Sequence, residues 1–593
     1  PKLVSAVLKG LKRQMMENGH LSTLESHSSG PVPEEPLMEH GEWFYSWDVV
    51  NGGYLDPKGV EEARKLELDY IHRLGVWKKV PMEQCLKETG KKPIPLRWID
   101  TNKGDHDKPN LRSRLVVRDI KARKGPDEQL DPAVLFSAMP PIEGMRLLAS
   151  LLVTRKKSKH GKALKLGSWD ISRAHFYGTP KRNIFVQLPE EEGVDTTQEC
   201  GLLCKSMYGT QDAPAIWQDH YSSVLKDAGW KRGKSNGAVF YHPELDANIL
   251  VHGDDFLCLG DEDAQQKLDE VLRKAYELKK LGTLGFEEKD DKELSFLNRM
   301  IRVDQSSGAD CVVLEPDGRH VDLLVKELGL GTGKGVDTPD VKKSVDVQLL
   351  ESRSPPLPAE QVKQYRSLVM RAAYLGQDRA DIGHAVKTLS RKMVQPLEAD
   401  WQNLKRLGRY LKKHPYARLV FGPQKEPGKL KVQVDSDHAG DAVTRRSTTG
   451  MVVYHGRHPI KHSSSVQSTV ALSTGESEFY ALVKAGSTGL GIQSLMADWG
   501  IQSPLLVETD SSAAKGQSSR IGLGKSRHVQ TRYMWIQERV NAKHMLIHKV
   551  PGEKNTSDIL TKSTPGPTLR KHLKTMGYEF SESKSSGQKG LLT

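Results

Sequence analysis

The stretch NILVHGDDFLCLG, residues 248–260, places two adjacent carboxylates inside an apolar segment. Residues 249–251 and 256–259 have the composition of two short strands, and the bend between them contains Asp254 and Asp255. Adjacent like charges in a partly dry site repel each other and raise a pKa, so a cation is expected to compensate them. A divalent metal ion is the usual one. The stretch therefore predicts a hairpin with a metal site at its bend, although the same residues taken alone also fit an ordinary turn.

The composition is that of a multidomain globular chain in a reducing compartment. With 593 residues, 37% of them hydrophobic, the chain can form about three to five folded domains. Five cysteines argue against a disulfide framework, and no apolar run approaches the roughly 20 residues of a membrane span. Lysine and arginine number 88 against 75 acids, and the net charge of +13 favours a polyanionic partner. Because the chain starts at Pro1, we expect a piece of a longer protein.

Segments with the hydrophobic period of a helix alternate along the chain with segments typical of strands, which predicts a mixed α/β chain. Residues 350–430 are expected to be helical and basic: residues 401–430 contain eight Lys or Arg and one acid, which fits either a solvated helix face or a surface that follows phosphates. The tail after about residue 578 is rich in Ser, Lys and Gly and is expected to be disordered. Helices are predicted at 59–77, 142–153, 212–230, 261–282 and 474–500, and strands within 94–104, 111–120, 162–178, 429–440, 449–456 and 504–510.

A third acid is expected to join the two at the bend. Asp170 ends the apolar strand within residues 162–178, and it converges with Asp254 and Asp255 if that strand lies beside the hairpin. Hard cations such as Mg²⁺ prefer oxygen ligands and are held by a few carboxylates together with substrate phosphate. Two such ions about 4 Å apart stabilise both the attacking and the leaving oxygen of a phosphoryl displacement. This set of acids therefore suits nucleotidyl transfer.

A second set of acids follows the order strand, helix, strand and helix start. Each acid alone also fits an N-cap or a surface charge. Asp437 is an alternative to Asp435, and Glu476 is an alternative to Glu478. Asp435 is preferred because it ends the apolar alternation of its strand, and Glu478 because it keeps the helix register. The preferred set is Asp435 at a strand end, Glu478 on a helix, Asp510 at the next strand end and Asp558 at a helix start.

These segments resemble the polymerase and nuclease blocks of one known family. WDISRAHFYGTPKRNIFVQLP, LLCKSMYGTQDAPAIWQDHY and LVHGDDFLCLG resemble, in order and separation, three consecutive blocks of reverse transcriptases from copia-type LTR retrotransposons. RSRLVVRDI resembles their fingers motif, and YRSLVMRAAYLGQDRADIGHAVKTLSRKM resembles the segment that links polymerase to nuclease. VDSDHAGDAVTRRSTTG, VALSTGESEFYAL and PGEKNTSDILTK are similar to the ribonuclease H of the family. The resemblance covers about residues 80–575.

The resemblance implies an α/β (α+β) multidomain fold, with a right-hand polymerase, a helical connection and a ribonuclease H-like α/β domain. It also implies the C-terminal part of a Pol polyprotein or a fragment of one, because no protease, integrase or zinc-knuckle block is found. The expected divisions are 1–78 for an N-terminal linker or remnant with one helix, 79–325 for fingers and palm, 326–428 for a small thumb and basic connection, 429–577 for the ribonuclease H-like domain and 578–593 for a disordered tail.

The resemblance assigns roles to individual residues. Asp170, Asp254 and Asp255 would be the metal-binding palm aspartates, and the four acids of the second set would be the metal ligands of a ribonuclease H. Each site would hold two Mg²⁺ or Mn²⁺ ions, of which one lowers the pKa of an attacking water in the nuclease and the other stabilises the leaving oxygen. Arg112 and Arg114 would contact the incoming triphosphate, although an exposed strand face also fits them.

Three positions depart from the family pattern, and one histidine keeps an open role. The usual Tyr-Val-Asp-Asp of the hairpin is here His-Gly-Asp-Asp at residues 252–255. His175 stands where an aromatic residue screens the sugar 2′ position. Asp212 stands near the triphosphate where Gln is usual, which is unfavourable for an acid unless it points away. His528 is a candidate for assisting product release in the nuclease, or else a packed or surface histidine.

The implied function is an RNA-directed DNA polymerase with ribonuclease H activity. The chain would copy element RNA into DNA and hydrolyse the RNA of the hybrid, with RNA template, DNA primer, RNA–DNA hybrid and deoxynucleoside triphosphates as partners. The protease, integrase and capsid parts of the same polyprotein are further expected partners, in a cytoplasmic virus-like particle and in the nucleus. The alternatives are a degraded or domesticated fragment that binds nucleic acid without polymerising, and a nuclease alone.

Overall fold

The structure is a computed structural model that describes residues 46–48, 53–104, 109–119, 130–524 and 528–581. Helices occur together with parallel and antiparallel strand pairs, which confirms the mixed α/β class. The five-part division by function stays a prediction, and most of the expected linker and tail lies outside the described residues. Within the described ranges, no helix combines the length and the apolarity needed to cross a membrane. The chain divides into two compact units, one made mainly of Pro1–Asp127 and Thr179–Gln211, the other of Glu128–Gly178 and Asp212–Leu592.

The first unit contains the predicted strand pair. Strands β4 (Leu96–Asn102) and β5 (Leu111–Val117) are antiparallel, and α2 (Pro57–Arg73) packs on β5. Helix α2 begins where the Asp56 carboxylate accepts a hydrogen bond from Gly59 N at 2.8 Å, a common N-cap. A second sheet has the order β3-β8-β7. The remaining elements are β1 (Ser46–Trp47), β2 (Tyr54–Leu55), β3 (Trp77–Pro81), α3 (Met82–Thr89), β7 (Phe185–Val186), η4 (Glu190–Glu192) and β8 (Glu199–Leu203).

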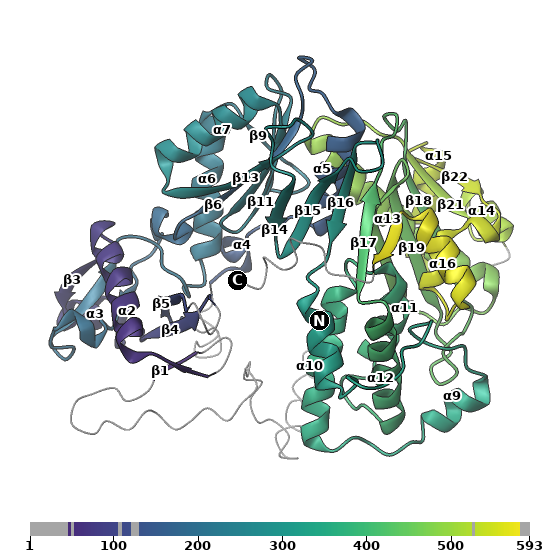
Figure 1. The fold of residues 1–593 in the computed structure, drawn as a ribbon, viewed down its shortest axis with the longest axis horizontal. Coiled ribbons are helices and arrows are strands. Elements are labelled where there is room, and N and C mark those ends of the chain that lie inside the picture. The colour runs from purple at the N-terminus through teal and green to yellow at the C-terminus, as the bar shows by residue number, and fades with distance from the viewer. Residues whose placement is uncertain (1–45, 49–52, 105–108, 120–129, 525–527, 582–593) are drawn as a thin grey trace. The chain divides into compact units, whose positions relative to one another are not determined.

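The second unit contains a six-stranded sheet, in the order β13-β6-β12-β11-β10-β9, that includes the predicted hairpin of β11 (Ala247–His252) and β12 (Asp255–Gly260). Ile249 is buried in the core that α6 and α7 cover, whereas Leu250 is buried in the core that contains α5. Burial on both faces explains why these strands are continuously apolar rather than alternating. Figure 1 shows α6 and α7 together beside this sheet. Its other elements are α4 (Pro132–Leu135), α5 (Ile142–Arg155), β6 (Lys165–Ile171), η3 (Ala174–Tyr177), α6 (Ala213–Asp227), β9 (Lys231–Arg232), β10 (Val239–His242), α7 (Glu262–Ala275) and β13 (Leu278–Leu284).

One predicted helix is too long. The sequence predicts a helix over 261–282, but α7 ends at Ala275 and residues 278–284 form β13, which pairs with β6. Helical periodicity is a local signal, whereas the unpaired backbone groups along one side of β6 attract a strand from far along the chain. The register of this pair shifts between Lys280 and Gly282, so the added strand is irregular.

A five-stranded antiparallel sheet joins distant parts of the chain in the order β14-β15-β16-β17-β23. The sequence predicts neither β17 (Tyr416–Phe421), in the region expected to be helical, nor β23 (Tyr578–Ser581), in the expected disordered tail. Arg418 of one strand pairs with Glu579 of the other at 2.7 Å. Both strands complete a sheet through long-range pairing, which local composition does not reveal. The others are β14 (Glu293–Phe296), β15 (Arg299–Asp304) and β16 (Cys311–Glu315).

A second five-stranded sheet, in the order β20-β19-β18-β21-β22, contains the second set of acids. Strand β18 is antiparallel to β19 and parallel to β21. The predicted long helix is α13 (Thr474–Asp498), whose 25 residues pack on β18 and β21. The elements of this region are β18 (Leu430–Ser436), β19 (Thr448–His455), β20 (His458–Val466), β21 (Leu505–Thr509), α14 (Ser512–Ser519), η6 (Thr531–Met534), α15 (Trp535–Asn541), β22 (Met545–Lys549), η7 (Gly552–Lys554), η8 (Thr556–Leu560) and α16 (Gly566–Thr575).

Helix α5 contacts the six-stranded sheet and both five-stranded sheets that the structure describes in the second unit, and it is buried almost all round. Its Arg146 donates to Asp378 at 2.8 Å and to the carbonyl of Ile460 in β20 at 3.3 Å. Its Ser150 Oγ lies 2.7 Å from Nδ1 of His455, at the end of β19. One hydrophobic core runs from α5 through the sheets to α13 and α16. The sheet with the first set of acids and the sheet with the second set therefore belong to the same compact unit.

The basic helix predicted near residue 410 is α12 (Glu398–Lys413), and several of its charges hold the fold together. Lys412 Nζ donates to the carbonyls of Leu330 at 2.9 Å and Gly333 at 2.8 Å, and Lys413 pairs with Asp337 at 2.7 Å. These contacts favour a structural role for these two lysines over a phosphate-binding one. The other helices of this region are α8 (Arg319–Glu327), α9 (Val345–Glu351), α10 (Ala359–Leu375), η5 (Ala380–Ile382) and α11 (Gly383–Ser390).

A buried ion pair in this helical region is expected to be essential for its stability. Arg379 donates to Asp381 at 2.6 Å, both side chains are fully buried, and Tyr410 donates to the same carboxylate at 2.9 Å. Burial alone would raise the pKa of Asp381, but Arg379 holds that pKa below its ordinary value. Arg379→Met leaves a buried unpaired carboxylate, so we expect a loss of about 3–5 kcal/mol of unfolding free energy in denaturant melts.

The matched control for this prediction removes both charges at once. The double variant Arg379→Met with Asp381→Leu has no uncompensated charge and is expected to recover most of the lost stability. If the double variant is as unstable as the single one, packing around Arg379 rather than the ion pair determines the stability.

Candidate metal centres

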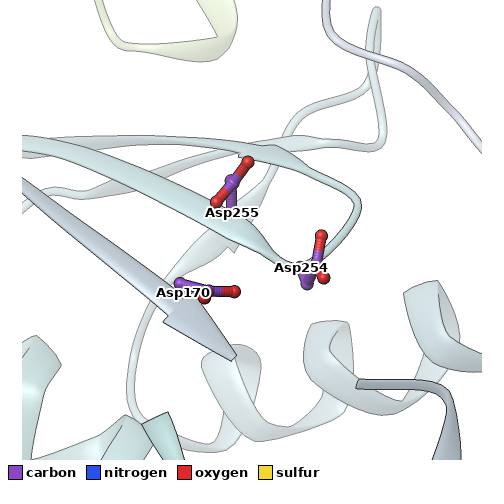
Figure 2. A group of neighbouring side chains, drawn as sticks. All are labelled: Asp170, Asp254 and Asp255. Carbon is purple, nitrogen blue, oxygen red and sulfur yellow. The ribbon is translucent and has the colours of Figure 1, made fainter. Parts of the chain in front are cut away.

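The first cluster lies where two neighbouring strands of the six-stranded sheet end. Asp170 is near the end of β6 and Asp255 begins β12, and the two residues lie directly opposite each other in the antiparallel register. Asp254 occupies the turn that joins β11 to β12. One carboxylate oxygen of each of these three residues lies within 4.8 Å of the others. Figure 2 shows the three side chains together at the end of the hairpin. The structure therefore brings together the three acids that the sequence groups.

Backbone contacts set the direction of this turn. Gly253 has a φ of +65°, a conformation that other residues rarely adopt, which explains a glycine between His252 and Asp254. Trp217 Nε1 on α6 donates to the Gly253 carbonyl at 2.7 Å. Ile171 N donates to the Asp254 carbonyl at 3.0 Å. The turn is thus tied both to the helix that covers the sheet and to the neighbouring strand.

The three carboxylates form a site that suits a cation. Burial raises the pKa of Asp255 to about 7, and the negative charges of Asp254 and Asp170 add to the rise. A cation among these oxygens would remove the repulsion and favour the ionised form of Asp255. Three carboxylates on a rigid sheet fit Mg²⁺, which is held by a few such oxygens and keeps its other positions for water and phosphate.

The predicted nucleotide-binding residues lie in both units. In the second unit, His175 lies in η3, and Asp212 immediately precedes α6 and is only 3% exposed. In the first unit, Arg112 and Arg114 lie on β5, and the Arg114 guanidinium lies 5.0 Å from the ring centroid of Tyr208. Contact of any of these residues with a triphosphate stays a prediction.

The second cluster lies at one edge of the sheet that packs against α13. Asp435 is near the end of β18, and Asp510 directly follows β21. Because these two strands are parallel neighbours, their carboxyl ends lie at the same edge. Glu478 comes from the first turns of α13, and one oxygen of each of the three acids lies within 4.8 Å of the others. The structure therefore brings together three of the four acids that the sequence groups.

Hydrogen bonds orient the carboxylates of Asp435 and Glu478, and one Glu478 oxygen has no partner among the described residues. Thr561 Oγ1 donates to Asp435 at 2.6 Å, and Ser436 N donates to Glu478 Oε1 at 3.3 Å. Glu478 Oε2 is buried and has no hydrogen-bond partner among the described residues. Burial, reinforced by Asp435 and Asp510, raises the pKa of Glu478 to about 9, and burial raises that of Asp435 to about 6. A buried acceptor without a partner is costly, and a bound divalent cation would satisfy it.

The fourth acid, Asp558, lies beside this cluster on the short 3-10 helix η8 and forms an ion pair with Lys562. Burial is the largest cause of the raised pKa of Asp435 and of Asp510, and the negative charge of Asp558 raises both further. Lys562 is not among the residues predicted from the sequence, although its spacing of four residues from Asp558 is a visible signal for an ion pair. The second site therefore contains a positive side chain next to its acids.

The two acids that the sequence sets aside have partners of their own. Glu476 accepts hydrogen bonds from Tyr480 and from His528, the latter at 2.8 Å. Asp437 accepts a hydrogen bond from Thr448 N. His528 is thus joined to Glu476 rather than to the three-acid cluster, and its auxiliary role stays a prediction.

Comparisons with known proteins find a matching family model and similar Pol polyproteins. Residues 83–290 match the family model described as Reverse transcriptase (RNA-dependent DNA polymerase). The retrovirus-related Pol polyprotein from transposon TNT 1-94 of Nicotiana tabacum is 26% identical over 520 residues, which are 85% of this chain and 36% of the relative. That from transposon RE2 of Arabidopsis thaliana is 27% identical over 479 residues, 79% of this chain and 31% of the relative. The chain thus spans about a third of the length of these relatives.

A comparison with solved structures finds a neighbour of low identity. The foamy viral protease-reverse transcriptase in complex with RNA/DNA hybrid is 12% identical, with a TM-score of 0.44. The match covers 86% of this chain and 57% of the other.

Proposed function

Because the chain contains a reverse transcriptase domain of the kind found in Pol polyproteins of copia-type retrotransposons, we propose that it extends a DNA primer on an RNA template at the first cluster. We further propose that the second cluster hydrolyses the RNA of the resulting hybrid. The observation that carries the proposal is the convergence of two separate carboxylate triads, each within 4.8 Å, from residues far apart in the chain. The first triad lies inside the residues that match the family model.

In the polymerase, Asp170, Asp254 and Asp255 would hold two divalent ions against the triphosphate. Such ions activate the primer 3′ hydroxyl and stabilise the leaving oxygen. The chain contributes rigid placement, since the pairing of β6 with β12 fixes the distance between two of the acids. Burial lowers the pKa of His252, so a neutral imidazole rather than a cation occupies the position where the family has tyrosine.

In the nuclease, Asp435, Glu478 and Asp510 would hold the ions that activate water against the RNA strand. Thr561 and the backbone of Ser436 orient two of these carboxylates before any ion binds. A hybrid would be recognised through its backbone and 2′-hydroxyl groups rather than its base edges. Binding is therefore expected to tolerate any sequence, with affinity that falls as salt rises.

Primer extension tests the proposal directly. The full chain is expected to extend a DNA primer on an RNA template when Mg²⁺ or Mn²⁺ is present, and EDTA is expected to abolish both extension and hybrid cleavage, because both sites depend on bound cations. Asp170→Asn serves as the negative control for extension. Hybrid binding without extension by the wild type would instead favour the alternative of a degraded or domesticated fragment.

The same proposal extends to partners and location. RNA template, DNA primer and deoxynucleoside triphosphates would be its substrates, and other parts of the same polyprotein would be its protein partners. A virus-like particle in the cytoplasm would be the place of synthesis, with the nucleus as a further location. Co-sedimentation of the chain with element RNA and capsid in a particle fraction would test this placement.

A further inference from the structure

The C-terminal end of helix α13 is anchored on the six-stranded sheet, far along the chain from the first metal cluster. Asp498 is the last residue of α13, and its carboxylate accepts three backbone hydrogen bonds from the loop between β9 and β10. The donors are Lys234 N at 2.9 Å, Ser235 N at 2.9 Å and Asn236 N at 3.1 Å. Successive N–H groups directed at one carboxylate form an anion-binding nest, in which hydrogen bonds are charge-assisted. The helix end is therefore fixed to this loop.

The next residue, Trp499, contacts the strand that leads to the catalytic turn. Its side chain is 1% exposed, and its Nε1 donates to the carbonyl of Ile249 in β11 at 3.2 Å. In return, Asn248 Nδ2 donates to the carbonyl of Trp499 at 3.3 Å. The indole also lies against Gly144 of α5, where an added Cβ would clash with Leu250 of the same strand. Helix α5 and the end of α13 thus both hold strand β11, and we call this set of contacts the clamp.

This clamp lies a short distance from the metal ligands. Strand β11 continues from Ile249 to His252, and Asp254 and Asp255 follow at the turn. Three residue steps of strand lead from Ile249 to His252, about 10 Å of extended chain, and the turn with Asp254 follows directly. The clamp therefore holds the base of the hairpin whose tip contains two adjacent, mutually repelling carboxylates. A displacement of about 1 Å at such a tip can lower a rate by about 100-fold, because the ions and the primer end must be aligned.

We propose that Asp498 and Trp499 are positioning residues of the polymerase site, so that the nuclease-like domain is a working part of the polymerase. This inference rests on the proposed function of the first cluster. It assigns a role to the end of α13 that is separate from the role of its beginning, where Glu478 belongs to the second cluster. The two positions lie 20 residues apart on one helix, about 30 Å. Changes at the C-terminal end are therefore expected to affect extension and to spare hybrid cleavage.

Substitutions in the full chain separate positioning from simple stabilisation. Trp499→Phe removes the indole N–H and keeps an aromatic ring, while Asp498→Ala removes the acceptor of the three backbone bonds. Each is expected to lower the maximal extension rate by about 10-fold to 100-fold and to raise the Mg²⁺ concentration needed for half-maximal extension. Hybrid cleavage should change by less than about twofold, since the second cluster is about 30 Å away along the helix.

Two further variants serve as controls. Asp498→Asn keeps one acceptor oxygen and is expected to restore most of the extension rate lost in Asp498→Ala. Ser494→Ala changes an exposed residue one turn earlier on the same helix and is expected to leave both activities unchanged. If Trp499→Phe and Asp498→Ala melt at lower temperature but keep the wild-type extension rate and Mg²⁺ requirement per folded molecule, the role is structural and the inference fails.

A measurement that needs no polymerisation distinguishes this inference from the proposed function. Mn²⁺ affinity of the first cluster is measured by titration in a background with Asp435→Asn, Glu478→Gln and Asp510→Asn, which removes the charges of the second triad. Weaker Mn²⁺ binding after Trp499→Phe supports positioning of the carboxylates, even if the wild type proves unable to extend a primer. Equal Mn²⁺ binding with and without the substitution overturns the inference, whatever the extension assay shows.

Discussion

The Asp255→Asn variant is expected to extend a primer at least about 1,000-fold more slowly than the wild type, a loss comparable to removal of other groups that act on charge in a transition state. Asp255 is the cross-strand partner of Asp170, and its oxygen lies within 4.8 Å of those of Asp170 and Asp254. Asparagine keeps the volume but has no charge and presents a donor to a cation. We therefore expect the loss in the maximal rate, measured under single-turnover conditions, rather than in primer binding.

Hybrid cleavage and stability are the internal controls of this experiment. Cleavage depends on the second cluster and should stay at the wild-type level. The melting temperature without metal should stay the same or rise, because the substitution removes one of three mutually repelling carboxylates, and burial already disfavours its ionised form. Asp263→Asn, an exposed acid at the start of α7, is the matched surface control and should change neither activity. Parallel loss of extension and cleavage in Asp255→Asn would show that the two sites are not separate.

The parts of this molecule that the sequence predicts well are those with a local physical signature. The hairpin around Asp254 has two apolar runs and a polar bend, and it is found at β11 and β12. The first acid triad follows from the rule that acids at strand ends meet when the strands are neighbours, and Asp170 does lie opposite Asp255. The same rule applies to Asp435 and Asp510 of the second triad, whereas Glu478 comes from a helix. The hydrophobic pattern identifies such elements because the residues that a strand or a helix buries recur at a fixed spacing within a few positions.

The parts that cannot be predicted from the sequence depend on partners far along the chain. Strand β13 begins inside a predicted helix, and β23 lies inside an expected disordered tail. Each of these strands forms by pairing with the unpaired backbone groups of a neighbouring strand. The residues of the strand itself give no sign that this partner is present. The contacts of Trp499 with β11 are missed for the same reason, since an apolar residue after a helix end gives no sign of what it covers.

Charge counts are equally ambiguous without the fold. The basic excess near residue 410 fits a nucleic-acid surface, yet Lys412 binds loop carbonyls and Lys413 pairs with Asp337. Lysine side chains are long enough to serve either purpose, and only the position of neighbouring carbonyl and carboxylate groups decides between them. Any phosphate-binding surface on this helix must therefore be built from its remaining basic residues.

The Glu478→Gln variant is expected to lose hybrid cleavage by at least about 1,000-fold and, without metal, to be more stable than the wild type at alkaline pH. Burial, together with Asp435 and Asp510, raises the pKa of Glu478 from its ordinary 4.5 to about 9. Between these two values the folded state binds more protons than the unfolded state, so the stability of the wild type falls as pH rises from about 4.5 to about 9. Glutamine does not titrate, and the variant should lack this part of the slope.

Melting curves in EDTA from pH 5 to pH 9 measure this difference, which is largest at the alkaline end. The slope due to one such group cannot exceed about 1.4 kcal/mol per pH unit, and Mg²⁺ should reduce it in the wild type, because a bound cation stabilises the ionised carboxylate. Glu476→Gln is the matched control: burial opposes ionisation there, but hydrogen bonds from Tyr480 and His528 lower the pKa, so this variant should lose stability above about pH 4.5. If both variants changed stability in the same direction, the two neighbouring glutamates would not occupy the opposite environments that the structure gives them. If Glu478→Gln retained cleavage, the second cluster would not be a nuclease site.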